Sequence, residues 1–181
     1  MKNKFLIVFI IICIFSCLGI YGYLVYTNFK YPFSYKTEIV EYSIKYDISC
    51  ELVASLINCE SGFDKSVISS KGAIGLMQIM PKTAQYICEK LGEEYSYENL
   101  FTPKFNISLG TYYLNYLKQK FDDETVILCA YNAGEGVVSG WLNNSDYSSD
   151  KKTLSHIPYK ETREYVKKVQ DGKKVYAKKF A

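Results

Sequence analysis

The feature that most constrains this chain is an uncharged, apolar stretch close to its N-terminus. Residues 5–26, FLIVFIIICIFSCLGIYGYLVY, contain no charged side chain, and Lys2 and Lys4 stand before them. A helix needs about 20 apolar residues to cross a bilayer, whereas the apolar part of a cleaved signal peptide usually has about 7–15. The stretch therefore predicts a transmembrane anchor, that is an uncleaved signal, over residues 5–26.

The residues around this stretch indicate how it is oriented. The lysines at its start favour a cytoplasmic stub, residues 1–4, and a main domain outside the cytoplasm. No small-residue cleavage signal follows before Lys30, so an uncleaved anchor is favoured over a cleaved signal peptide. A lipoprotein signal that ends at Cys17 comes third, because the apolar run continues past that cysteine. We expect a single-pass protein of the cell membrane.

The remaining residues predict one mainly α-helical domain. A chain of 181 residues has room for one domain with a substantial core. We expect a linker over 27–36 and a folded domain over 37–181. Apolar residues recur at helical spacing in the segments 37–48, 50–60, 82–92, 104–121, 122–134, 136–142 and 161–180. No convincing strand pattern occurs outside the loop between the second and third of these helices, so the fold class is all-α.

Cysteine spacing and net charge narrow the possible functions. The cysteines beyond the anchor, Cys50, Cys59, Cys88 and Cys129, form no C-x-x-C pair, and the single histidine, His156, has none of them nearby in sequence. We therefore expect buried free thiols, no metal site and no cofactor. The net charge of +3 does not indicate a nucleic-acid partner.

Charge is unevenly distributed along the chain. Residues 151–181 carry ten Lys or Arg against three acids, whereas residues 38–100 carry five against ten. The basic end is either a solvated helix face or a surface that is attracted to an anionic partner, such as wall polymer or lipid headgroups.

Glu60 is an ionisable residue in an apolar helical stripe. Val53, Leu56, Ile57 and Glu60 follow i, i+3, i+4, i+7 spacing, and Gly62 then ends the helix. Burial and the negative end of the helix dipole both raise the pKa of a carboxyl group, and no basic residue lies within four positions. A glutamate that keeps its proton near neutral pH can act as a general acid. The alternative is a glutamate that points to solvent at a frayed helix end.

Four short motifs resemble one enzyme family. ES at 60–61, GLMQ at 75–78, AYNAG at 130–134 and KETREYV at 160–166 stand in the order and approximate spacing of the soluble lytic transglycosylases. The similarity covers residues 38 to about 170. It implies a lysozyme-like α fold and cleavage of the β-1,4 bond between N-acetylmuramic acid and N-acetylglucosamine in peptidoglycan, which leaves a 1,6-anhydro end. The expected partners are then peptidoglycan glycan strands and the cytoplasmic membrane, with the catalytic domain on the cell wall side.

The resemblance also implies roles for individual residues. Glu60 matches the catalytic residue, which protonates the glycosidic oxygen and then accepts the proton of the sugar's C6 hydroxyl as that oxygen attacks C1. The matched positions expected to bind or line the substrate are Ser61, Met77, Gln78, Tyr131, Asn132 and Tyr165. Four of them have a structural alternative: a helix cap for Ser61, and core packing for Met77, Tyr131 and Tyr165.

A second carboxylate would point to a different reaction. Glycosidases that use water usually place two carboxyl groups across the scissile bond. Asp64 and Glu135 lie near the motifs, but neither occupies a position that resembles a nucleophile. The sequence therefore favours a single-glutamate lytic transglycosylase. The alternatives are a lysozyme-type muramidase that hydrolyses the same bond, and a non-catalytic module for wall binding or envelope assembly.

Overall fold

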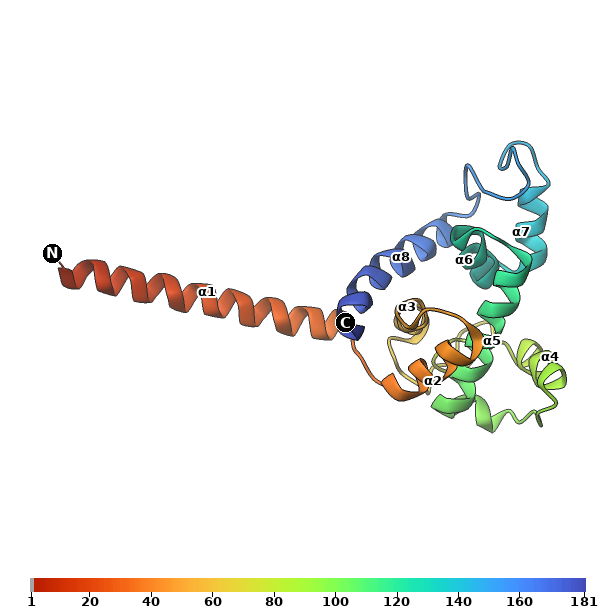
Figure 1. Cartoon of the computed structure of the whole chain (residues 1–181), viewed down its shortest axis with the longest axis horizontal. Helices are drawn as coiled ribbons and strands as arrows, with labels where there is room; N and C mark the ends of the chain where they lie inside the picture. Colours follow the sequence, from red (N-terminus) through yellow and green to blue (C-terminus); the bar gives the residue numbers. More distant parts are fainter. Residues whose placement is uncertain (1) are drawn as a thin grey trace. The chain divides into compact units, whose positions relative to one another are not determined.

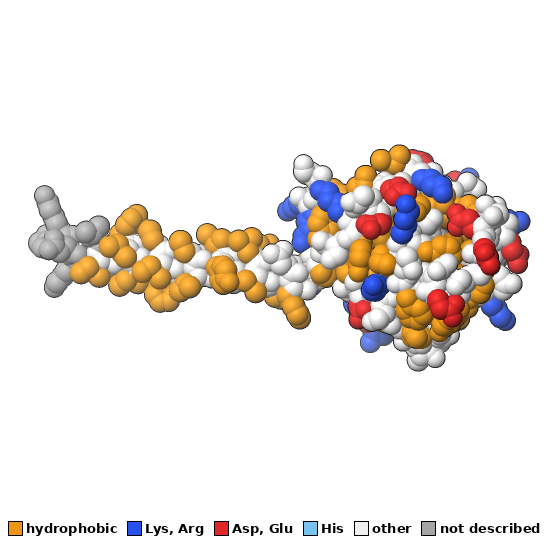
Figure 2. Space-filling model, turned by 90° about the horizontal axis from the view of Figure 1, so that it is seen from below, with side chains coloured by type: hydrophobic (Ala, Val, Ile, Leu, Met, Phe, Trp, Pro, Cys, Tyr) orange, Lys and Arg blue, Asp and Glu red, His pale blue; other side chains and the backbone are white. Residues whose placement is uncertain are grey.

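The computed structural model describes residues 2–181 and divides the chain into two compact units, with the boundary between Phe33 and Ser34. The first unit contains the helix α1 (Lys2–Lys30), whose side chains are largely hydrophobic (Figure 2). Its segment Phe9–Lys30 is long and apolar enough to cross a membrane, and it is not buried in the structure. Because α1 continues through residues 27–30, the linker is shorter than expected and covers 31–35.

The second unit is helical, which confirms the predicted fold class (Figure 1). Its elements are α2 (Lys36–Tyr46), α3 (Cys50–Ser61), α4 (Pro81–Leu91), the 3₁₀ helix η1 (Glu98–Phe101), α5 (Pro103–Lys120), α6 (Glu124–Ala133), α7 (Glu135–Leu142) and α8 (Lys160–Phe180). The described residues contain isolated β-bridges at Ile74 but no strand. The sequence pattern did not predict η1, since a single 3₁₀ turn is too short to show a periodicity.

Local signals explain where these helices begin and end. Pro81 and Pro103 occupy the first positions of α4 and α5, where the missing N–H of proline costs nothing. The Asp123 side chain accepts a hydrogen bond from the Val126 N–H and so caps α6. Gly62 ends α3 with a φ of 60°, in the left-handed region that favours glycine.

The packing of α3 against α8 brings the two ends of the domain sequence together. The Ser55 hydroxyl of α3 donates a 2.6 Å hydrogen bond to the Val169 carbonyl of α8. At the same level α8 has Gly172, and a Cβ there would overlap the Ser55 oxygen. The two helices therefore approach more closely than ordinary side chains allow. This contact sets the position of Tyr165, which lies on α8 two turns before Gly172.

A buried asparagine holds the loop between α3 and α4. The Asn106 side chain accepts a hydrogen bond from the Met77 N–H (2.8 Å) and donates to the carbonyls of Ile74 (2.9 Å) and Leu100 (2.8 Å). The loop passes so close to this side chain that a Cβ at Gly75 would overlap it, and Gly75 has a φ of 78°. The loop that carries the GLMQ motif is therefore fixed from inside the domain.

Candidate active site

Glu60 lies in the last turn of α3, partly buried, and receives a hydrogen bond from α8. The Tyr165 hydroxyl donates to Glu60 Oε1 at 2.7 Å. Burial raises the pKa of Glu60 to about 7, and the hydrogen bond from Tyr165 lowers it by a smaller amount. The carboxyl group is therefore protonated in a large fraction of molecules at neutral pH, and the same group can also take up a proton.

Two phenols lie near this carboxyl group, that of the buried Tyr165 and that of the half-buried Tyr131. Tyr165 and Tyr131 both have a pKa well above the usual value, chiefly through burial and then through the nearby charge of Glu60. Both hydroxyls stay neutral and serve as donors. The Tyr131 hydroxyl donates to the Met77 carbonyl at 2.8 Å, so α6 is joined to the loop before α4.

The residues of the ES and GLMQ motifs stabilise one another. The Ser61 hydroxyl lies 2.9 Å from the Leu76 carbonyl and 3.1 Å from the Ile57 carbonyl, so it joins the end of α3 to the loop. Gln78 has a φ of 49°, and its amide nitrogen donates to the carbonyls of Val67 (3.1 Å) and Gly75 (2.9 Å). Both amide hydrogens of Gln78 are thus used within the loop, and its Oε1 accepts no hydrogen bond from the described part of the chain.

Two expected site residues, Met77 and Asn132, contact other helices of the domain. The side chain of Met77 is fully buried and packs against Gly110 of α5, where a Cβ would overlap its sulfur. This placement is the core-packing alternative, and it follows because a glycine on α5 leaves room for the thioether. The Asn132 Oδ1 accepts a 2.8 Å hydrogen bond from the Thr162 hydroxyl, so α6 and α8 are joined beside the Glu60–Tyr165 pair.

The two other acidic residues near the motifs have their own partners. Asp64 is exposed and accepts hydrogen bonds from the backbone N–H and the hydroxyl of Ser66. Glu135 pairs with Lys120 at 2.9 Å. The causes of the shifted pKa of Glu60 are burial and the hydrogen bond from Tyr165, and no carboxylate of the described residues is among them.

A tyrosine-rich cavity of about 380 Å³ adjoins this cluster. Its lining residues are Lys82, Thr83, Tyr86, Tyr113, Tyr116 and Glu135. The ring of Tyr113 contacts that of Tyr131, with 5.5 Å between the ring centroids, and so connects the cavity with the surroundings of Glu60. Aromatic faces beside amines and carboxylates suit a ligand that has both apolar faces and hydroxyl groups.

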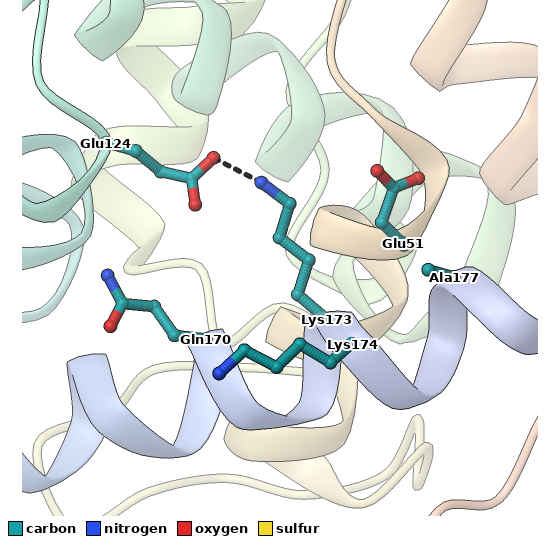
Figure 3. Close-up of a pocket in the computed structure, with 6 residues that line it drawn as sticks. All are labelled: Glu51, Glu124, Gln170, Lys173, Lys174 and Ala177. Carbon is teal, nitrogen blue, oxygen red and sulfur yellow. Dashed lines mark hydrogen bonds and ion pairs between the residues drawn. The ribbon is translucent and has the colours of Figure 1, made fainter.

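A larger hollow of about 410 Å³ lies elsewhere on the domain. Figure 3 shows it between α3, α6 and α8, with the ion pair Lys173–Glu124 across it. Glu51 of α3 also lines it. Glu51 precedes Glu60 by nine residues on the same helix, which corresponds to about 13 Å. The hollow of Figure 3 and Glu60 are therefore separate, and among the described residues the Glu60–Tyr165 pair is related to the tyrosine-rich cavity only through the contact between Tyr131 and Tyr113.

Several residues that shape the site carry no motif. Asn106 and the Ser55–Gly172 contact position the loop or α8, and sequence reasoning missed them. It also gave no role to Thr162, although this residue lies within the KETREYV motif. One signal was available for Asn106, since it is an amide in the helical segment predicted at 104–121, where a buried polar group needs partners. Among the described residues no group of three metal-ligating side chains occurs, and the described cysteines are free thiols, of which Cys88 and Cys129 are buried.

Known proteins are similar to this chain in sequence and in fold. The family model described as "Transglycosylase SLT domain" matches residues 38–154. The "Soluble lytic murein transglycosylase" of Salmonella typhimurium is 37% identical over 144 residues, which are 77% of this chain and 22% of that protein. The "Membrane-bound lytic murein transglycosylase C" of Photorhabdus laumondii is 30% identical over 175 residues, 81% of this chain and 48% of that protein.

A solved structure agrees with these similarities. The X-ray structure of an inactive mutant of the lytic transglycosylase Slt from Pseudomonas aeruginosa superposes with a TM-score of 0.76 at 29% sequence identity. The match covers 85% of this chain and 25% of that one. The chain thus spans about a fifth to a half of the length of these relatives, and its helical unit corresponds to one part of them.

Proposed function

Because the chain belongs to the SLT transglycosylase family, we propose that it is a membrane-anchored lytic transglycosylase of peptidoglycan, with Glu60 as its single catalytic carboxyl group. The bond cleaved is the β-1,4 bond between N-acetylmuramic acid and N-acetylglucosamine. The observation that carries the proposal is the Glu60–Tyr165 pair, in which a carboxyl group of pKa about 7 has a phenol, and no carboxylate of the described residues, as its partner.

The proposed reaction uses Glu60 twice. Protonated Glu60 gives its proton to the glycosidic oxygen while the bond between that oxygen and C1 of the muramic acid breaks. The carboxylate that results accepts the proton of the C6 hydroxyl, and the C6 oxygen forms the new bond to C1. No water is consumed, and Glu60 ends in the protonated state in which it began. A group whose pKa lies near the working pH suits both steps.

The other site residues have supporting roles in this proposal. Tyr165 orients Glu60, and Ser61 with Asn106 holds the loop next to it. The free Oε1 of Gln78 is an acceptor for acetamido or hydroxyl groups of the glycan, and Tyr131 and Asn132 stand on the α6 side of the substrate. Met77 supports the loop from the core. The neighbouring cavity with Tyr86, Tyr113 and Tyr116 receives a sugar ring.

We also propose how the chain is placed in the cell. Residues 5–26 form a single-pass anchor of the cell membrane, residues 1–4 lie in the cytoplasm, and residues 37–181 form the catalytic domain on the wall side. The length and apolar surface of Phe9–Lys30 support the anchor. Lys2 and Lys4 support the orientation. Tyr21, Tyr23 and Tyr26 near the end of the stretch are typical of a membrane–water interface.

Mass spectrometry of the reaction products tests the proposed chemistry. The full chain in detergent is incubated with purified peptidoglycan, and the released muropeptides are weighed. Products with anhydromuramic ends, lighter by one water than hydrolysed ones, are expected. Free reducing muramic ends would mean that water attacks and that the enzyme is a muramidase. A folded chain that binds glycan without releasing products would be a binding module.

The variant Glu60→Gln tests the single carboxyl group. It should lose at least about a thousandfold in cleavage rate, since proton transfer by one positioned group contributes about 10²–10⁴ and Glu60 performs two such transfers. Glycan binding, measured by co-sedimentation with insoluble peptidoglycan, should remain. Asp64→Asn is the matched control and should retain activity within a few-fold. A Glu60→Gln enzyme that cleaves as fast as the parent would refute the assignment.

A further inference from the structure

The outer face of α8 carries an excess of positive charge. The helix has eight Lys or Arg and three acids. Its buried residues are Thr162, Tyr165, Val166, Val169, Gly172 and Tyr176. Most of the basic side chains lie on the other, solvent-facing side, whereas Lys173 points toward α6 and pairs with Glu124. Ion pairs with Glu164 and Asp171 engage Lys160, Lys167 and Lys174. Asp171 pairs with both Lys167 and Lys174, so the acids on this face are fewer than the bases and its net charge is positive.

This charge continues onto the first residue of the domain's first helix. The Lys36 amine of α2 lies over the ring of Phe180, the last residue of α8, at 5.7 Å from the ring centroid. Lys36, Lys174 and Lys178 are exposed, and Lys179 is partly exposed. We call these four residues the tether-end lysines. The acids near them include Asp171 on α8, which pairs with Lys174, Glu51 on α3, which lines the same hollow as Lys174, and Glu38 in the first turn of α2.

The linker keeps this group close to the end of α1. Residues 31–35 are five in number, and an extended chain of that length spans at most about 18 Å. In an anchored protein the tether-end lysines therefore stay within a short distance of the lipid headgroups. Such confinement acts as a high effective concentration, so a weak electrostatic attraction is enough to hold the surfaces together.

We propose that the tether-end lysines bind anionic phospholipid headgroups and so dock the domain on the membrane surface. The inference rests on the proposed anchor. Such docking has a consequence for the active site. Tyr165 precedes Lys178 by 13 residues on α8, which corresponds to about 20 Å along the helix. Docking by the end of α8 leaves Glu60 and its cavity away from the headgroups, where glycan strands can reach them.

Lysine footprinting of the full chain in vesicles tests the docking. The chain is reconstituted in vesicles of phosphatidylcholine and in vesicles that also contain phosphatidylglycerol, and an amine-acylating reagent is added. Mass spectrometry then gives the acylation rate of each lysine. We expect a several-fold slower rate for Lys174, Lys178 and Lys179 in the anionic vesicles, and recovery in high salt. Lys151 and Lys152, exposed in the loop before α8, should react equally in both.

A charge-matched pair of variants sharpens this test. In Lys178→Gln/Lys179→Gln, the protection of Lys174 should be lost, because two lysines near an anionic surface shift the docking equilibrium by roughly tenfold or more. In Lys151→Gln/Lys152→Gln, which loses the same charge at the other end of α8, protection should persist. Both variants should keep the parent's cleavage rate on soluble glycan in detergent, since none of these residues lies near Glu60.

The outcomes separate docking from anchoring. Flotation with phosphatidylcholine vesicles reports the anchor, and a chain that floats with neither vesicle overturns the anchor and the docking together. A chain that floats with both but shows equal acylation rates overturns the docking alone, and the lysines are then a solvated face. If poly(glycerol phosphate), added to phosphatidylcholine vesicles, protects these lysines while phosphatidylglycerol does not, the partner is a wall polymer and the lipid proposal fails.

Discussion

At the scale of single residues, the burial that suits Glu60 to its proposed chemistry also destabilises the fold. The ordinary pKa of a glutamate is 4.5, and in the folded chain that of Glu60 is about 7. Between these values the folded state holds a proton that the unfolded state releases, so stability falls as the pH rises. Below pH 4.5 both states are protonated and the cost is absent. Above pH 7 it is fully present.

The variant Glu60→Gln should therefore be more stable than the parent, and increasingly so at higher pH. Near pH 4 the two should unfold alike, and at pH 8 the variant should gain up to about 3 kcal/mol, the equivalent of the whole shift in pKa. Urea denaturation at a series of pH values measures this difference. A gain that does not depend on pH would mean that the pKa of Glu60 is ordinary.

Tyr165→Phe should change the pH profile of cleavage as well as its rate. The Tyr165 hydrogen bond lowers the pKa of Glu60, so its loss raises that pKa and moves the alkaline decline of activity to higher pH. The rate should fall about tenfold or more, because Glu60 loses a group that orients it. Tyr159→Phe removes an exposed hydroxyl just before α8 and should leave both unchanged. A lower rate with an unmoved profile would assign Tyr165 a packing role only.

At the scale of elements, the site depends on how closely α8 approaches α3. Gly172→Ala would push the new methyl group against the Ser55 hydroxyl and displace the helix that carries Tyr165. We expect a loss of about 1–3 kcal/mol in unfolding free energy, as for other overpacked cores, together with reduced cleavage. Denaturant unfolding and the rate of muropeptide release measure the two effects.

A second substitution should relieve the strain. In Ser55→Ala/Gly172→Ala the oxygen is gone, the nearest remaining atom of residue 55 lies at 3.4 Å, and most of the stability should return. Gly140→Ala is the control, because this helical glycine has open space around it and alanine should stabilise α7 by about 1 kcal/mol. If the double variant is no better than Gly172→Ala, the Ser55 hydroxyl is not what limits the approach.

The elements themselves could be predicted from the sequence far better than their contacts. Proline at the starts of α4 and α5 and glycine after α3 and α4 mark four helix ends in the sequence. Asn106 illustrates the contacts that could not be predicted. Its partners are backbone groups of Ile74, Met77 and Leu100, and hydrogen bonds between such separate segments leave no periodic pattern in the sequence. Met77 shows the same limit, because only the place of Gly110 beside it decides that its side chain lies in the core.

The position of Glu60 could be predicted in part. The apolar stripe indicated burial and a raised pKa, and the structure agrees with both. That Tyr165, 105 residues further on, belongs to the site followed from the family resemblance and not from any local pattern, and its hydrogen bond to Glu60 is a finding of the structure. The roles assigned to the site residues remain proposals for the experiments above.

At the scale of the whole molecule, the division into two units predicts that the helical unit is independent of α1. A chain of residues 34–181 should remain soluble and helical, and it should cleave peptidoglycan at the parent's rate in detergent, because its core lies within the second unit. Circular dichroism, gel filtration and muropeptide release measure this. It should no longer float with vesicles of phosphatidylcholine. Aggregation of the shortened chain would show that residues before 34 belong to the domain.

The short linker, residues 31–35, also has a consequence for where such an enzyme finds its substrate. An anchored chain diffuses in a plane, so its encounters with glycan depend on its surface density and not on its concentration in a volume. With a linker that spans at most about 18 Å, an anchored helical unit in the proposed orientation reaches only the glycan that lies next to the membrane.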